Sequence, residues 1–391
     1  MRKNNINVWR VNYFMEKKYN ILLFRSDYIK NNNYTAGYLQ LSNALKKLGH
    51  KVILFGLNSK TRFEQDLVLL KMPFNKRSIF MIELFLFLPV YCVIKHIDVV
   101  IVNNRIVPGT LFLLLLKKLL SIKIITDCRS IPVEENIPWD FSPACKVAEK
   151  WYNGATFITE GTKNFIQHKY GLKYKKYAII PSAVDPSLFS PVLPENGVAK
   201  IKEFTKDRIT IFYHGSISRN RGVNLIIEAV NQIKNTFPNI LFMSVSNANN
   251  YINNYCSEKN YNLNDNLYLI NPVRYDKMAA YINLADICII PLPKINWWEI
   301  SSPLKLMEYL AMEKPIVLSN IKAHRKVVPV NSKFALYFNP NEPNDLGEKI
   351  TRAITNIEEM KNNSYIERKI ILKKYTWDIQ AKNLEKFIQT I

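Results

Sequence analysis

The sequence has few glycines and no paired cysteines. Glycine accounts for only 11 of 391 residues, and neither a G-x-G-x-x-G fingerprint nor a G-x-x-x-x-G-K-[ST] phosphate loop occurs. The five cysteines are scattered, without the short spacings of zinc sites. This pattern argues against a disulfide framework and a zinc site, and we expect a reducing compartment, the cytoplasm.

The composition fits neither disorder nor a single small core. Hydrophobic residues make up 48% and charged residues 22% of the chain, as in folded soluble proteins. A chain of 391 residues is too long for one ordinary core, so two domains of typical size are expected.

Acidic residues are scarce relative to basic ones, which gives a formal net charge of +22. Residues 1–190 hold 28 Lys and Arg against 13 Asp and Glu, and residues 191–391 hold 26 against 19. A basic half favours a polyanionic partner, either an anionic membrane surface or nucleic acid. The basic residues lack the interleaved aromatics or recognition helix of nucleic-acid-binding proteins, which disfavours nucleic acid. Because Asn, Lys and Ile are abundant throughout, compositional bias without function is the alternative.

Short apolar runs alternate with helix-like segments along most of the chain. In the first half the expected strands are 19–25, 51–55, 99–102, 123–126, 155–158 and 177–180. In the second half they are 209–213, 240–245, 267–270, 287–290 and 315–319, with helices at 223–233 and 278–285. Strand–helix–strand units at this spacing form parallel sheets, so we predict an α/β fold with two Rossmann-like, doubly wound domains.

Domain boundaries follow from the same alternation. The proline-containing stretch 191–197 is the best linker candidate. We divide the chain into an N-terminal extension (1–18), a first Rossmann-like domain (19–190), a second one (191–370) and a C-terminal segment (371–391).

Two long apolar runs, 79–94 and 111–120, interrupt this pattern in the first half. Both are shorter than the ~20 residues of a membrane span, and charged residues or proline break them. Basic residues flank both runs, which suits a protein lying on a membrane. Two ordinary core helices of an α/β domain are the alternative.

The stretch 301–311 has the pattern of a helix start aimed at an anion. Ser302 suits the N-cap and Pro303 the first helical position. The free amides of Leu304 and the following lysine, with the positive end of the helix dipole, then form a phosphate site. About one turn further, the Glu308 carboxylate suits the paired hydroxyls of a ribose. An amphipathic core helix with a surface ion pair is the alternative.

A second loop, 211–222, also joins a strand to a helix and contains Gly215, Arg219 and Arg221. Ligands of open α/β sheets bind at the carboxyl ends of the strands, where guanidinium groups suit a diphosphate. A solvated basic loop is the alternative for this stretch alone.

A third junction of the same kind, 270–275, brings Val273 and Arg274 to the same edge of the sheet. Together the three junctions offer phosphate donors, a hydroxyl acceptor and backbone for a base. The combination predicts a nucleotide-diphosphate site without a glycine-rich fingerprint.

Here the chain resembles the retaining nucleotide-sugar glycosyltransferases of family 4, which have the GT-B fold. The similarity covers nearly the whole length. The segments that carry it are Met307–Val317 (MEYLAMEKPIV), Tyr213–Ala229, Ile180–Asp185 with Leu188-Phe189, Leu269–Pro291 and Trp377-Asp378. The resemblance implies two Rossmann-like domains facing across a cleft, with a C-terminal helix that crosses back to the first.

The resemblance also implies roles for individual residues. Glu308 would bind the ribose hydroxyls, and Arg221 matches the basic phosphate ligand, with Arg219 and Lys305 as its partners. The family's first carboxylate falls on Ile300 in this chain, and Glu299 is one place earlier. Glu299 is either the ligand of the transferred sugar or an exposed glutamate beside two tryptophans.

Three other positions depart from the family or match it. Ser216 replaces a usual arginine of the family. Arg129, which ends a strand of the first domain, either contacts donor phosphate or acceptor, or forms a structural ion pair with Asp127 or Glu134. Gly37, after the first strand, would let the backbone approach the diphosphate.

No histidine in the sequence has the context of a catalytic base. His214 and His324 are interpreted as ordinary loop histidines. The family's usual mechanism lets the leaving phosphate take the acceptor proton, so we expect no dedicated base, no metal and no cofactor besides the nucleotide-sugar co-substrate.

The predicted function is therefore transfer of a sugar from a nucleotide-diphosphate sugar to a glycolipid, polysaccharide or other glycan acceptor. The basic, apolar first domain places the enzyme on the inner face of the plasma membrane as a peripheral protein. A nucleotide-sugar epimerase of the same two-domain fold and a basic nucleic-acid-binding protein are the alternatives.

Overall fold

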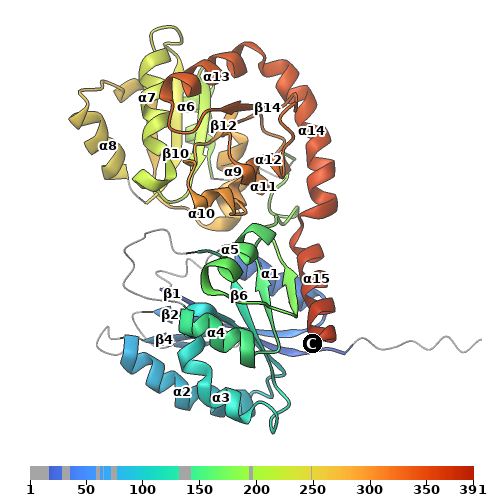
Figure 1. Cartoon of the computed structure of the whole chain (residues 1–391). Coiled ribbons are helices and arrows are strands. Elements are labelled where there is room, and N and C mark those ends of the chain that lie inside the picture. The colour runs from blue at the N-terminus through green and yellow to red at the C-terminus, as the bar shows by residue number, and fades with distance from the viewer. Residues whose placement is uncertain are drawn as a thin grey trace, which may run out of the picture.

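The computed structural model describes residues 17–28, 36–58, 62–64, 66–71, 77–131, 142–192, 197–247 and 249–391. They form two α/β units, one above the other, with two long helices near the C-terminus running down one side of both (Figure 1). Nearly all of the predicted extension, 1–18, lies outside the described residues, as does the middle of the predicted linker. The domain boundaries stay predictions.

The first unit is built on an eight-stranded sheet of order β3-β4-β2-β1-β5-β6-β7-β8. All its neighbouring strands pair in parallel except the edge strand β3, which is antiparallel to β4. The strands are β1 (Asn20–Tyr28), β2 (Lys51–Asn58), β3 (Arg62–Glu64), β4 (Leu67–Lys71), β5 (Val99–Asn103), β6 (Lys123–Cys128), β7 (Gly154–Phe157) and β8 (Tyr177–Ile179). The central strands are apolar almost throughout because helices cover both faces of the sheet.

Two helical layers cover this sheet. One core contains Leu23 of β1, Leu41 of α1 (Ala36–Lys47) and Leu384 of α15 (Trp377–Thr390). The core on the other face contains Leu22 of β1 and side chains of α2 (Arg77–Ile94), η2 (Asn104–Thr110), α3 (Leu111–Leu116) and α4 (Ser142–Trp151). Helix α5 (Glu160–Tyr170) follows β7. Among the described residues, no helix is both long enough and apolar enough to cross a membrane.

The second unit is built on a six-stranded parallel sheet of order β11-β10-β9-β12-β13-β14. Its strands are β9 (Ile209–His214), β10 (Ile240–Val245), β11 (Leu267–Ile270), β12 (Ile287–Ile290), β13 (Ile316–Ser319) and β14 (Ala335–Phe338). One face is covered by α7 (Val223–Ile233), α8 (Asn249–Glu258) and α13 (Pro343–Thr355). The other is covered by α9 (Met278–Asn283), α11 (Leu304–Ala311), α12 (Lys322–Arg325) and α14 (Ile357–Lys374).

Shorter elements complete this unit. They are α6 (Ala199–Thr205), η3 (Arg219–Arg221), η4 (Asn264–Asn266), η5 (Tyr275–Lys277) and α10 (Asn296–Glu299).

The C-terminal helices join the two units. Helix α14 packs on α11 of the second unit, and α15 returns to pack on α1 and β8 of the first. At the junction, Trp377 N–H donates to the Val184 carbonyl at 3.2 Å, and Val184 N–H donates to Tyr375. The predicted α/β class with two doubly wound sheets and a C-terminal helix crossing back is confirmed.

The sequence pattern missed the shortest elements. It did not predict β3, β4 or β14, and it extended the helix that starts at Leu111 by several residues. These strands have three to five residues and lie at or next to a sheet edge. A run that short, buried on part of its surface only, carries too little periodicity to be recognised.

Gly222 packs closely against the backbone of Pro291, the residue that follows β12. It is the N-cap of α7, its φ is 69°, and a Cβ at this position would lie 2.0 Å from the Pro291 carbonyl oxygen. Gly171, the C-cap of α5, has a similar φ of 64° but open space around it.

We therefore expect Gly222→Ala to lower the free energy of unfolding by about 3 kcal/mol or more, from backbone strain and the clash together. Gly171→Ala should lower it by about 1 kcal/mol, from strain alone. Urea unfolding of both variants measures the difference, and equal losses would contradict this account of Gly222.

Candidate functional site

The cleft between the two units holds a pocket of about 620 Å³. Residues of both units line it, at the carboxyl ends of the parallel strands, as expected for a doubly wound fold. Nine of the predicted site residues are among them: Gly37, Arg129, Gly215, Arg221, Val273, Ser302, Leu304, Lys305 and Glu308. The structure thus brings together residues that lie far apart in the sequence.

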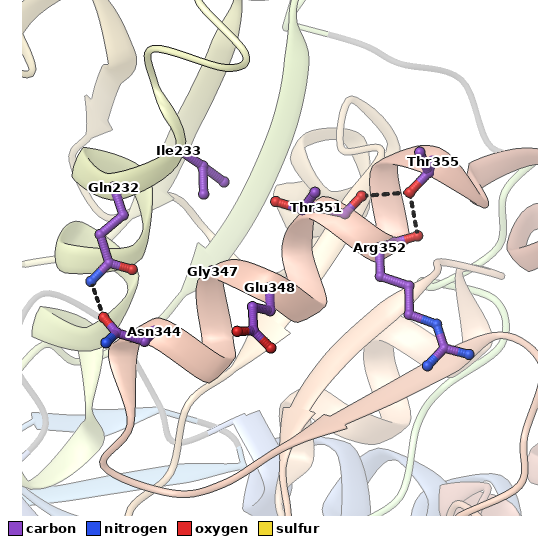
Figure 2. Close-up of a pocket in the computed structure, with 8 residues that line it drawn as sticks. All are labelled: Gln232, Ile233, Asn344, Gly347, Glu348, Thr351, Arg352 and Thr355. Atoms are coloured by element: carbon purple, nitrogen blue, oxygen red, sulfur yellow. Dashed lines mark hydrogen bonds between the residues drawn. The ribbon is translucent and has the colours of Figure 1, made fainter.

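A second pocket of similar volume lies on the second unit, between α7 and α13 (Figure 2). Gln232 donates to Asn344 at 2.5 Å across it, and the Glu348 and Arg352 side chains lie along α13. None of the predicted site residues lines this pocket. Its side chains do not converge on a common point, so the cleft is the candidate site.

The start of α11 differs from the prediction. Pro303 is the N-cap with extended backbone, Leu304 is the first helical residue, and Ser302 is not the cap. Instead the Ser302 hydroxyl accepts from Ser182 N–H at 3.1 Å, and the Ser302 carbonyl accepts from the Ser182 hydroxyl at 2.7 Å. Pro303 offers no side-chain acceptor, so no side chain caps the helix. The first-turn amides therefore remain available to a ligand in the cleft.

Glu308 lies on α11 with only 1% of its surface exposed. Its Oε2 is 2.8 Å from His214 Nε2, and its Oε1 accepts a hydrogen bond from the Tyr275 hydroxyl at 2.7 Å. A buried carboxylate without such partners would cost several kcal/mol. The two bonds tie together the end of β9, η5 and α11.

The protonation states in this network are mutually consistent. Burial lowers the pKa of His214 despite the opposing effect of Glu308, so the imidazole is neutral at neutral pH. Burial also raises the pKa values of Tyr275 and Tyr309 well above the usual range, so both phenols keep their protons. His214 Nε2–H can then donate to Glu308 while Nδ1, 3.0 Å from the Tyr309 hydroxyl, accepts.

The interpretation of both histidines as ordinary loop residues is wrong. His214 is the buried last residue of β9 and holds Glu308. His324 is in α12, fully buried, and its Nδ1 donates to the Ser319 carbonyl at 2.7 Å. His324 does not line the cleft. Sequence context alone missed His214 because its partner Glu308 is 94 residues away.

Two cations close enough to affect each other's protonation line the cleft. Lys305 Nζ is 4.9 Å from the centre of the Tyr213 ring, and the Arg221 guanidinium is 5.1 Å from the centre of the Trp298 ring. Burial, and then the neighbouring Arg221, lower the pKa of Lys305 to about 7. Gly215, at a φ of 105°, makes room for the amine, because a Cβ there would lie 2.9 Å from Nζ. An anion bound here would relieve the repulsion.

Arg129 forms the structural ion pair that the sequence left open. Its Nε is 3.0 Å from Asp127 Oδ2, and its NH1 group donates to the Ile180 carbonyl at 3.1 Å. Asp127 also accepts from the Tyr38 hydroxyl and, at 2.6 Å, from the Thr156 hydroxyl. Glu134, the other suggested partner, lies outside the described residues. Arg129 lines the cleft, but the partners that hold its guanidinium group are Asp127 and the Ile180 carbonyl.

Two predicted site residues, Glu299 and Arg274, do not line the pocket. Glu299 points to the start of α12, where its Oε2 accepts from Lys322 N–H at 3.4 Å, so its expected contact with the transferred sugar is not supported. Arg274 is exposed and paired with Asp276 at 3.0 Å. The Arg219 side chain lies outside the described part of the structure.

Ile300, at the position of the family's first carboxylate, connects the two units through its backbone carbonyl. The Ile300 carbonyl accepts from the hydroxyls of Thr159, at 2.5 Å, and Thr162, at 3.0 Å, at the start of α5. Gly37 is the second residue of α1 and lies against Trp377, so it lines the cleft from a helix and not from a loop after β1.

The sequence also missed Arg25, Tyr38 and Tyr275, which line the cleft. Tyr275 lies five residues after the end of β11. Its place just after a strand is the feature of the sequence that could have identified it as a site residue. Within the described residues, no group of three or more His, Cys, Asp or Glu side chains is arranged to hold a metal ion.

Two doubly wound units with a cleft between them define a protein of the double-Rossmann class. The chain belongs to the group 1 glycosyltransferases, enzymes of the GT-B fold. The family model described as "Glycosyl transferases group 1" matches residues 208–356, and that described as "Glycosyltransferase Family 4" matches residues 37–188. No curated protein matches the sequence.

Solved structures of glycosyltransferases share the whole fold. A glycosyltransferase from Rickettsia africae ESF-5 aligns with a TM-score of 0.73 and 16% identity over 95% of this chain and 98% of that one. Sucrose-phosphate synthase from Thermosynechococcus elongatus aligns with a TM-score of 0.73 and 15% identity over 95% and 99%. Anabaena Alr3699/HepE in complex with UDP-glucose aligns with a TM-score of 0.73 and 11% identity over 95% and 100%.

The Tyr275–Glu308 hydrogen bond is testable by a double-mutant cycle. We expect Tyr275→Phe and Glu308→Gln to be coupled by about 0.5–3 kcal/mol in the free energy of unfolding, because one removes the donor of the buried bond and the other removes the charge of its acceptor. Tyr337→Phe, which removes a 2.6 Å bond to the Val328 carbonyl elsewhere in the second unit, is the matched partner for an uncoupled cycle with Glu308→Gln. Additive losses in both cycles would refute the network.

Proposed function

We propose that this glycosyltransferase is a retaining enzyme that transfers a sugar from a nucleotide-diphosphate sugar to a glycan or lipid-linked acceptor. The observation that carries the proposal is that Arg221, Lys305, Glu308 and the uncapped start of α11 line one pocket. The cations and helix amides suit the diphosphate of a nucleotide diphosphate, and the carboxylate suits its ribose.

The diphosphate is proposed to bind between Arg221, Lys305 and the amides of the first turn of α11. Positive groups fixed in a cleft stabilise the charge that develops on a leaving diphosphate. Lys305 comes from α11 and Arg221 from η3. Folding thus brings the two cations to one pocket from two separate elements.

The ribose is proposed to bind Glu308. A carboxylate accepts about four hydrogen bonds, and His214 and Tyr275 use one on each oxygen. The remaining acceptor positions suit the two hydroxyls of a ribose. His214 and Tyr275 then act as positioning residues, which hold the carboxylate in one orientation before the donor arrives.

The proposed chemistry is the one that the resemblance to the retaining family implies. In the proposed reaction the bond between the sugar anomeric carbon and the diphosphate breaks, and the acceptor oxygen bonds to the same face of that carbon. The acceptor proton passes to an oxygen of the leaving phosphate. Among the described residues that line the cleft, Glu308 is the one carboxylate, and it is already held by two partners, so no side chain is assigned as a base.

The first unit provides the acceptor side of the pocket, through Arg25, Gly37, Tyr38 and Arg129 among others. We propose a glycolipid or a growing polysaccharide as acceptor, because the first half of the chain carries most of the positive charge. UDP and UDP-glucose bind to HepE, which shares the fold, so UDP-glucose is the first donor to test. Release of an epimerised sugar without any acceptor would favour an epimerase instead.

Removing the proposed donor ligands should weaken donor binding. Arg221→Ala and Glu308→Ala should each raise the dissociation constant for the nucleotide sugar by at least about tenfold, because a charged hydrogen bond contributes roughly 1.5–3 kcal/mol. Arg352→Ala and Glu348→Ala, in the pocket of Figure 2, are matched controls that should change nothing. Calorimetric titration with UDP-glucose measures all four, and wild-type affinity in both cleft variants would overturn the site.

Donor binding should also depend on pH through Lys305. The free protein holds this amine at a pKa of about 7, and a neighbouring diphosphate raises that pKa, so binding takes up a proton above pH 7. The association constant should therefore fall as the pH rises from about 7 to about 9, approaching tenfold per unit.

UDP-glucose suits this measurement because both its phosphates are esterified and do not titrate near neutral pH. Lys305→Met should bind more weakly and lose this slope, while Lys349→Met, on α13 and paired with Asp345, should keep it. A slope retained by Lys305→Met would assign the proton to another group.

A further inference from the structure

The outer faces of α2 and α3 are apolar although they are exposed. Eight aliphatic side chains on these helices and in the turn that follows α3 are between 41% and 81% exposed: Ile82, Leu86, Val90, Val93, Ile94, Leu111, Leu115 and Leu119. We call them the apolar face. Along each helical segment they recur three to four residues apart, so each segment presents one continuous row.

The two rows form one surface. Phe85 of α2 stacks on Phe112 of α3 with ring centres 5.2 Å apart and planes tilted by 21°. The helices lie next to each other at the end of the first unit that is farthest from the second unit (Figure 1). Their opposite sides, including Leu84, Leu88 and Leu113, are already buried against the first sheet. The apolar face therefore takes no part in the core of the first unit.

Lysines and a tryptophan border the apolar face. Lys95 follows α2, Lys117 and Lys118 follow α3, and all three belong to the basic half of the chain. Lys117 donates to the Trp151 carbonyl, and the Trp151 ring, 54% exposed, lies 5.3 Å from Lys150 Nζ. Lysine ammonium groups match the phosphates of anionic lipids, and an exposed tryptophan suits the boundary between water and hydrocarbon.

One acidic residue opposes this pattern. Glu83 is exposed on α2, seven residues before Val90 and so on nearly the same side of the helix. Its negative charge would repel an anionic surface. Replacing Glu83 with a basic residue should therefore strengthen binding to such a surface.

We propose that the apolar face docks on an anionic phospholipid membrane, with the flanking lysines on lipid phosphates and the aliphatic side chains in the acyl boundary. The charge pattern favours a membrane over a second copy of the chain. Apolar rows bordered by lysine fit an anionic lipid surface, whereas two copies of the basic first unit would repel each other. The proposal goes beyond sugar transfer, since it concerns the opposite end of the first unit from the cleft.

Flotation with vesicles tests the proposal on the full chain. Vesicles of equal parts phosphatidylglycerol and phosphatidylcholine are compared with pure phosphatidylcholine, at low and high salt. The triple variant Leu86→Ser, Leu115→Ser, Leu119→Ser removes apolar area from both rows. A matched control, Val192→Ser, Val330→Ser, Ile366→Ser, removes exposed aliphatic side chains elsewhere.

We expect the wild type and the matched control to bind anionic vesicles, and the triple variant to bind at least about tenfold more weakly. Salt should weaken binding. Glu83→Lys should strengthen it, and Lys95→Glu with Lys118→Glu should weaken it. UDP-glucose affinity should stay unchanged in every variant, which separates this proposal from the assignment of the cleft.

Three results would overturn the proposal. The first is no binding of the wild type to anionic vesicles at low salt. The second is equal binding of the triple variant and the matched control. The third is a dimer that the triple variant abolishes, without vesicle binding, because the apolar face would then be an interface between two copies.

Discussion

The candidate site depends on one buried charge, the carboxylate of Glu308. Because this group is shielded from water, the fold must supply hydrogen-bond donors in fixed positions, and it does so from the end of β9 and from η5. Only as a neutral imidazole can His214 donate from Nε2 to Glu308 and accept at Nδ1 from Tyr309, and burial lowers the pKa of this histidine. The Tyr309 hydroxyl, next to Glu308 on α11, completes the chain at His214 Nδ1. The same constraint that stabilises the carboxylate therefore orients it toward the cleft.

The residues just before α11 couple this site to the first unit. The Ile300 carbonyl accepts from two hydroxyls at the start of α5, and Ser302 exchanges two hydrogen bonds with Ser182. The helix that carries Lys305 and Glu308 thus starts from a segment held by the other unit. The C-terminal helices join the units a second time, through Val184 and Trp377. The two sides of the cleft are consequently positioned by the same set of contacts.

Much of the fold and part of the site were predictable from particular residues. Strands such as Ile240–Val245 and Ile287–Ile290 appeared as predicted, since buried parallel strands are apolar on both faces. The convergence of Arg221, Lys305 and Glu308 on one pocket followed from their places at strand-to-helix junctions. Glu299, which the sequence left open as a sugar ligand, points to α12, because one residue of shift along a short helix turns a side chain by about 100°.

By itself, the sequence determined the alternation of strands and helices, the two units, and the residue types available at each junction. These features depend on local spacing and on whether a side chain is apolar. Only the tertiary structure decided which partners each polar group finds. His214 meets Glu308 across 94 residues, Arg129 turns to Asp127, and Ser302 bonds to Ser182 instead of capping its helix. The physical reason is that a hydrogen bond or ion pair requires contact at about 3 Å, and such contacts between distant segments exist only once the sheets have formed.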